Sequence, residues 1–103
     1  MRKTKLSNRF NELRKHAEGS SVTLNTISAA ENIWNKLKKY IKHEPYLYIL
    51  NDTTAYFEWE DVDLELAHPD TLIIYFWADN KDTFKKYTIG QWKEVAKVIN
   101  ANI

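Results

Sequence analysis

The sequence predicts an α+β domain of two layers, in the order helix, helix, four or five antiparallel strands and helix, with the helices packed on one face of the sheet. Apolar residues recur at helical spacing near both ends of the chain, they alternate at strand spacing in its middle, and the period changes at Pro45. With 103 residues, 44% of them hydrophobic, and no cysteine, residues 1–103 are expected to form one domain without disulfides.

The first helix is expected over residues 7–18, after a basic and flexible segment at 1–6. Its apolar residues lie at three- and four-residue steps: Leu6, Phe10, Leu13 and Ala17. Ser7 is the expected N-cap, and Gly19 is placed to end the helix.

A polar connector over residues 20–25 is expected to lead into a second helix that ends near His43. Ser28 and Glu31 have the spacing of a capping box, and a broad apolar face follows them. The solvent side of this helix is rich in lysine, which also suits the negative end of the helix dipole: Lys36, Lys38, Lys39 and Lys42.

The middle of the chain is typical of short strands separated by turn residues. The expected strands are Tyr46–Leu50, Ala55–Glu60, Val62–Leu66, Thr71–Ala78 and Thr83–Thr88. Phe57 is odd-numbered and Val62 even-numbered, so the inward parity changes across Glu60 and Asp61, where a tight turn or a β-bulge is expected. Because Glu-Asp is a poor pair for a two-residue hairpin, a bulged long strand is favoured over the turn.

The last two strands differ in character. The strand over 71–78 is apolar on both faces, which predicts a central strand covered on both sides. Lys85 and Lys86 are typical of an edge strand, and the third helix then begins after Thr88, which forms a capping pair with Gln91. The tryptophans fall at inward positions and are expected in the core: Trp34, Trp59, Trp77 and Trp92.

Few residues offer catalytic or metal-binding chemistry. With only two glycines and two prolines, the chain cannot form a glycine-rich phosphate loop, and Asn and Asp are expected to make most turns, as at 51–52 and 79–80. The histidines lack the spacing of a helical metal site: His16, His43 and His68. The tripeptide at 68–70 is expected to be a plain turn. No catalytic residue, metal or cofactor is therefore expected.

Two carboxylate patterns have a more specific alternative. Glu58 and Glu60 would lie on one side of a strand, about 7 Å apart, as in a two-carboxylate hydrolase. Acids alternate over residues 60–65, but this segment lacks the glycine of a calcium-binding loop. No cleft or bound cation is indicated beside either pattern, so a solvated sheet face is the expected explanation of both.

Charge is strongly segregated along the chain. Between Glu44 and Asn80 there are nine carboxylates and no Lys or Arg. The formal charge is +7 for residues 1–43, −9 for 44–80 and +3 for 81–103, which together make the total of +1. Such segregation indicates a charged partner. Self-association of the basic helices with the acidic sheet of a second copy is one alternative, and salt would weaken it.

The acidic sheet face is the expected partner-binding surface. Tyrosine offers rigid contact area, and aligned carboxylates attract and orient a basic partner. The candidate residues are Tyr56, Glu58, Glu60, Asp61, Asp63 and Glu65, and by parity the face is expected to continue with Tyr46, Tyr48 and Tyr75. The alternative is that the first helix covers these tyrosines.

A protein without catalytic activity that binds another protein is the expected function, as for inhibitors, immunity proteins, antitoxins and modulators encoded by phages or mobile elements. If the target is a nucleic-acid enzyme, the carboxylates would occupy a groove meant for phosphates. The alternative is nucleic-acid binding through the basic N-terminal residues Arg2, Lys3, Lys5, Arg9, Arg14 and Lys15. No signal-peptide pattern and no membrane-length apolar run is present, so a cytoplasmic protein without membrane contact is expected.

Overall fold

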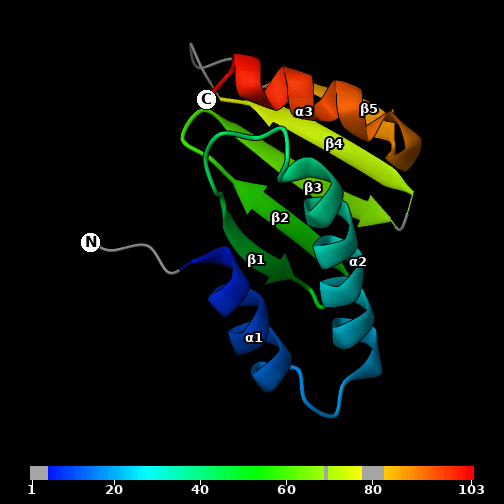
Figure 1. The fold of residues 1–103 in the computed structure, drawn as a ribbon. Coiled ribbons are helices and arrows are strands. Elements are labelled where there is room, and N and C mark those ends of the chain that lie inside the picture. The colour runs from blue at the N-terminus through cyan, green and yellow to red at the C-terminus, as the bar shows by residue number, and fades with distance from the viewer. Residues whose placement is uncertain (1–4, 69, 78–82) are drawn as a thin grey trace.

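A computed structural model describes residues 5–68, 70–77 and 83–103. Its elements are α1 (Leu6–His16), α2 (Ser21–Leu37), β1 (Tyr46–Leu50), β2 (Thr54–Glu58), β3 (Val62–His68), β4 (Thr71–Phe76), β5 (Thr83–Thr88), the 3₁₀-helix η2 (Ile89–Gln91) and α3 (Trp92–Ala101). The strands form one antiparallel sheet in chain order, with β3 at its centre, and the helices lie on one face of it (Figure 1). The predicted α+β class and element order are confirmed, as is the edge position of β5.

The second helix begins and ends earlier than the sequence predicts. The hydroxyl of its N-cap, Ser20, accepts a hydrogen bond from the backbone amide of Thr23 at 3.4 Å. The polar connector predicted over 20–25 is therefore wrong, because the residues after this cap are helical. The helix also ends at Leu37 rather than near His43, so part of the predicted lysine-rich helix surface lies beyond its C-terminus.

The first helix is tied to the chain before β1 by a contact that the sequence pattern does not reveal. Its N-cap is Lys5 rather than the predicted Ser7. The amide of Leu6, one of the free donors of the first turn, donates to the Glu44 carboxylate at 3.2 Å. Gly19 turns the chain toward α2 with φ of 89°, a left-handed conformation that favours glycine.

Two tight turns set the register of the first three strands. Asn51 and Asp52 have φ of 54° and 62°, which confirms the turn predicted there. The backbone amide of Trp59 donates to the carbonyl of Val62 at 3.0 Å, so Glu60-Asp61 forms a two-residue turn and the favoured bulged strand is wrong. The turn predicted at 79–80 lies outside the described residues, as does Pro69 of the turn at 68–70.

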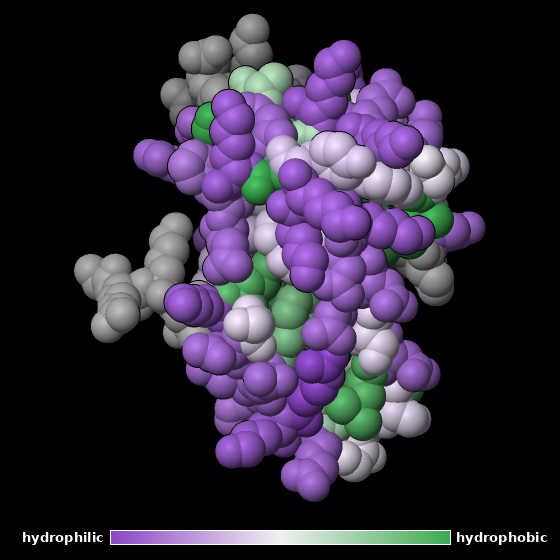
Figure 2. All heavy atoms as spheres, viewed as in Figure 1, coloured by the Kyte–Doolittle hydropathy of each residue, from purple (hydrophilic) through white to green (hydrophobic). Residues whose placement is uncertain are grey.

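The core lies between the helices and one face of the sheet. Phe57 and Leu64 are fully buried and face one another across β2 and β3. Trp34 of α2 stacks on Phe57 with ring centroids 6.0 Å apart, which joins the two layers. The predicted pair of Thr88 and Gln91 forms a capping box at the start of η2. Hydrophilic residues cover most of the side shown in Figure 2, on which the helices lie.

One strand and one tryptophan differ from the prediction. In β4, Leu72 and Ile74 are buried under the helices, but none of the described helices lies on the opposite face, where Ile73 is buried among its neighbours on the sheet and Tyr75 is partly exposed. Trp77, at the end of this strand, is 45% exposed and is not a core residue. Trp34 and Trp59 are buried as predicted, and Trp92 is partly buried against Tyr40, with ring centroids 5.5 Å apart.

Candidate functional site

The face of the sheet turned away from the helices carries most of the predicted site, and we call it the open sheet face. Strand register arranges its side chains in two rows. The first row is Tyr46, Glu58, Asp63, Tyr75 and Phe84, and the second is Tyr48, Tyr56, Glu65, Ile73 and Lys86. Their neighbours along the strands, such as Phe57 and Leu64, point into the core, because successive strand residues point to opposite faces.

A tyrosine cluster occupies the β1 side of the open sheet face. Tyr48 stacks on Tyr56 with ring centroids 5.0 Å apart and on Tyr46 at 6.3 Å. The α1 helix places its apolar residues in the core on the other face and meets this cluster through Arg9. The Arg9 guanidinium lies 4.9 Å from the centroid of the Tyr46 ring, and its Nε donates to the carbonyl of Leu47 at 2.7 Å. The first helix therefore borders the tyrosines rather than covering them.

A second aromatic cluster occupies the β4 and β5 side. The rings of Tyr75 and Trp77 are nearly parallel, with centroids 5.9 Å apart, and Phe84 lies 6.1 Å from Tyr75. Trp77 is 45% and Phe84 is 56% exposed. Large rings that are this exposed provide apolar area that can be buried against a partner.

A strip of carboxylates lies between the two aromatic clusters. Glu58 of β2 is directly opposite Asp63 of β3. Because the turn closes with a hydrogen bond between Trp59 and Val62, the next pair along the ladder makes no backbone hydrogen bonds, and opposing side chains come closest in such pairs. Glu65, two residues along β3, accepts a hydrogen bond from the Tyr75 hydroxyl at 2.6 Å.

Burial and mutual repulsion raise several pKa values on this face. Loss of hydration is the main cause that raises the pKa of Asp63, and the charge of Glu58 adds to it, whereas a hydrogen bond from Trp77 acts in the opposite direction. Burial, followed by the charge of Glu65, raises the pKa of Tyr56 to about 12. The hydrogen bond to Glu65 raises the pKa of Tyr75 to about 12. Both phenols are therefore hydrogen-bond donors at neutral pH.

Replacing Asp63 with Asn is expected to raise the melting temperature at pH 7. The pKa of Asp63 in the folded chain lies above its ordinary value of 3.8, so the folded chain binds this proton more tightly than the unfolded chain. Stability from this group is therefore fully present below about pH 3.8 and is lost as the pH rises through the raised pKa. In thermal unfolding from pH 3 to pH 7, the advantage of the Asn variant should shrink as the pH falls. An equal or lower melting temperature at pH 7 would contradict this expectation.

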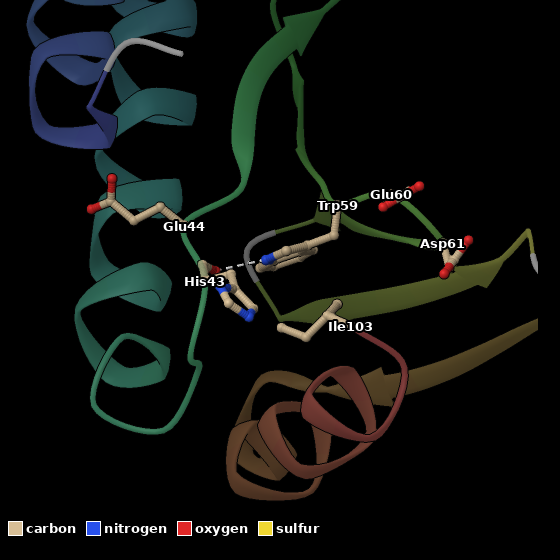
Figure 3. A pocket seen from close by; sticks show the side chains of 6 residues that line it. All are labelled: His43, Glu44, Trp59, Glu60, Asp61 and Ile103. Carbon is tan, nitrogen blue, oxygen red and sulfur yellow. Dashed lines mark hydrogen bonds between the residues drawn. The ribbon is translucent and has the colours of Figure 1, made fainter. Parts of the chain in front are cut away.

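Glu60 and Asp61 lie at the end of the sheet rather than on the open sheet face. They form the turn between β2 and β3 and border a hollow of about 460 Å³, which is lined by His43, Glu44, Trp59, Glu60, Asp61 and Ile103. Figure 3 shows Glu60 and Asp61 pointing away from the Trp59 ring. The indole Nε1 of Trp59 donates to the His43 carbonyl at 2.8 Å, which joins this turn to the segment after α2. Glu58 and Glu60 thus do not form the carboxylate pair considered for a hydrolase.

The predicted basic surface is partly engaged within the chain. Arg9 pairs with Glu12 at 3.4 Å in addition to its contacts with β1, and Arg14 pairs with Glu31 of α2. The remaining candidates are the exposed residues Lys5 and Lys15, together with Arg2 and Lys3, which lie outside the described residues. In the described part of α1, Arg9 and Arg14 thus each have an acidic neighbour, and the nucleic-acid alternative stays a prediction.

The described residues contain neither a candidate metal site nor a candidate bilayer-spanning helix. No group of three or more His, Asp and Glu side chains there is arranged to hold a metal ion. None of the helices in that part of the chain has the length and apolar character that a bilayer-spanning helix needs.

Parity in the sequence predicts the acidic side of the open sheet face and Tyr75 of the second aromatic cluster, but not the exposed Trp77 and Phe84 beside it. The sequence pattern predicts Trp77 in the core, and it marks the strand that contains Phe84 only as an edge strand. The signal was present in β5, where Phe84 and Lys86 share one parity and would pair with Tyr75 and Ile73 of β4. With this surface defined, comparison of the chain with protein families, with curated proteins and with solved structures gives no match.

Proposed function

We propose that the protein is a binding module without catalytic activity and that it binds another protein through the open sheet face. A single observation carries this proposal: a sheet face on which none of the described helices lies presents two aromatic clusters on either side of a carboxylate strip. Tryptophan and tyrosine are enriched among the few residues that carry most of the binding energy in protein interfaces, and fixed charges orient the partner. An inhibitor or modulator of a larger protein fits this arrangement.

The carboxylates favour a protein partner over a nucleic acid. Exposed aromatic rings on a sheet also bind unpaired bases, but proteins of that kind surround the rings with positive charge. Here Glu58, Asp63 and Glu65 lie between the rings, and they would repel a phosphate backbone. A basic protein surface, such as one that otherwise binds nucleic acid, has the matching charge.

The test is capture of a partner by the tagged full chain from its native host. The lysate is treated with nuclease, the washes use two salt concentrations, and bound proteins are identified by mass spectrometry. The proposal expects a protein in stoichiometric amount that survives nuclease. Material that disappears with nuclease would overturn it and would point to the basic residues of the N-terminal segment instead.

The Phe84→Ala variant is expected to weaken capture of this partner by about 10-fold or more, because it removes an exposed ring that would be buried on binding. Val22→Ala is the matched control: Val22 is 54% exposed and lies in α2, on the helical side of the molecule. Titration of both variants with the purified partner measures the difference. Equal losses in the two variants would mean that the open sheet face is not the binding surface.

A further inference from the structure

The open sheet face contains a pair of like charges for which the described residues supply no cationic partner, although a hydrogen bond from Trp77 partly stabilises the Asp63 carboxylate. Glu58 and Asp63 are directly opposite on β2 and β3, with Cβ atoms about 4.5–5.5 Å apart in a pair of this type. Asp63 is only 8% exposed, so little water is left to screen the repulsion. The ion pairs among the described residues are Arg9 with Glu12 and Arg14 with Glu31, all of them helix residues.

Two neighbouring carboxylates of this kind are a good receptor for one cation. Like charges on opposing strand positions destabilise the free sheet. A cation placed between them attracts both carboxylates, so the net electrostatic energy of the three groups becomes favourable. The binding of a partner can therefore recover energy that folding leaves unfavourable. The position is central, since aromatic residues lie on both sides of it in the same row, with Tyr46 on β1 and Tyr75 on β4.

The geometry favours a guanidinium over an ammonium group. A guanidinium is planar, is weakly hydrated, donates to two carboxylates at once and stacks on aromatic faces. The protein itself already contains one such contact, because the Arg9 guanidinium lies over the Tyr46 ring at the border of this face. The face therefore combines, around one point, carboxylate acceptors and rings of the kind on which arginine stacks.

We propose that an arginine side chain of the protein partner binds between Glu58 and Asp63, with its guanidinium bridging the two carboxylates and lying against the aromatic rings beside them. This inference rests on the proposed function, because it names the group by which that partner is recognised. The partner segment that carries the arginine crosses the face from one aromatic cluster to the other. The sheet spans about 19 Å between its edge strands, a distance that about six extended residues cover.

The test compares two synthetic peptides of about eight residues, one alternating Arg with Ser and the other Lys with Ser, so that length and charge are equal. Their affinity for the purified full chain is measured by calorimetry at low and moderate salt. The arginine peptide is expected to bind about 10-fold more tightly than the lysine peptide. Glu58→Gln is expected to weaken the arginine peptide about 10-fold and to reduce this preference.

Glu60→Gln is the matched control. It removes the same charge from an exposed residue in the adjacent turn, away from the face, and should change either affinity by less than about 3-fold. Melting temperatures of both variants establish that they are folded. Equal binding of the two peptides, binding of neither, or equal losses in Glu58→Gln and Glu60→Gln would each overturn the inference.

These outcomes separate the inference from the proposed function. If Phe84→Ala loses the captured partner while the peptides bind equally or not at all, the open sheet face binds a protein through another group. The proposed function then stands and the arginine site falls. If capture is as strong with Phe84→Ala as with Val22→Ala, the proposed function falls.

Discussion

The Glu58→Lys variant is expected to lose about 100-fold or more in affinity for the partner, which is about 3 kcal/mol, without loss of fold stability. The two effects have opposite signs for one physical reason. In the free protein, the new ammonium group would lie opposite Asp63 and replace a like-charge pair with an attractive one, which stabilises a strand pair by about 0.2–1 kcal/mol. In the complex, it would occupy the position of the partner's cation and repel it.

Isothermal titration with the purified partner and thermal unfolding of the free variant measure the two effects separately. Glu60→Lys is the control, because it makes the same change of charge two residues away and leaves the pair of Glu58 and Asp63 intact. It should alter affinity by less than about 3-fold, mainly through the association rate. A Glu58→Lys variant that binds as the wild type does, or that unfolds several degrees lower, would show that this residue has a structural role instead.

The order of elements could be predicted because each has a strong local signal. The helical spacing in α2 and α3 and the alternation in β2 and β3 decide which residues are helical and which are extended. The start of α1 involves a contact between distant residues, which leaves no such pattern. The start of α1 is set by the hydrogen bond between Leu6 and Glu44, and these residues are 38 positions apart in the chain.

Half of the candidate surface could be predicted from parity, and the rest required the register of the sheet. Parity places the side chains of Tyr56 and Glu58 on the sheet face away from Phe57. Only the tight turn at Glu60-Asp61 brings Asp63 of the neighbouring strand directly across from Glu58. One long bulged strand would have kept both residues on a single strand and would not have paired them. The apolar character of β4 on both faces indicates a covered strand, whereas none of the described helices lies on its outer face, where Tyr75 stacks on Trp77.

A second large effect tests which face of the sheet forms the core. Phe57→Ala is expected to lower the free energy of unfolding by about 3–5 kcal/mol, because Phe57 is fully buried and its removal leaves a cavity under Trp34. Tyr56→Ala changes the adjacent residue of the same strand, whose side chain lies on the open sheet face. Its expected loss is about 1–2 kcal/mol, since it gives up stacking on Tyr48 at a partly exposed position.

Urea unfolding of the two variants, followed by circular dichroism, gives both values from the same type of transition. A domain of this size has only about 5–15 kcal/mol of stability, so Phe57→Ala could be unfolded in part without denaturant. Phe57→Leu then gives a measurable loss of about 1 kcal/mol at the same position, because it keeps most of the apolar volume.

If Tyr56→Ala were as destabilising as Phe57→Ala, the face we describe as open would be packed against something in the free protein. The proposed binding surface would then be part of the fold. A large loss at Phe57 and a small one at Tyr56 would instead leave the tyrosine and carboxylate face free for a partner.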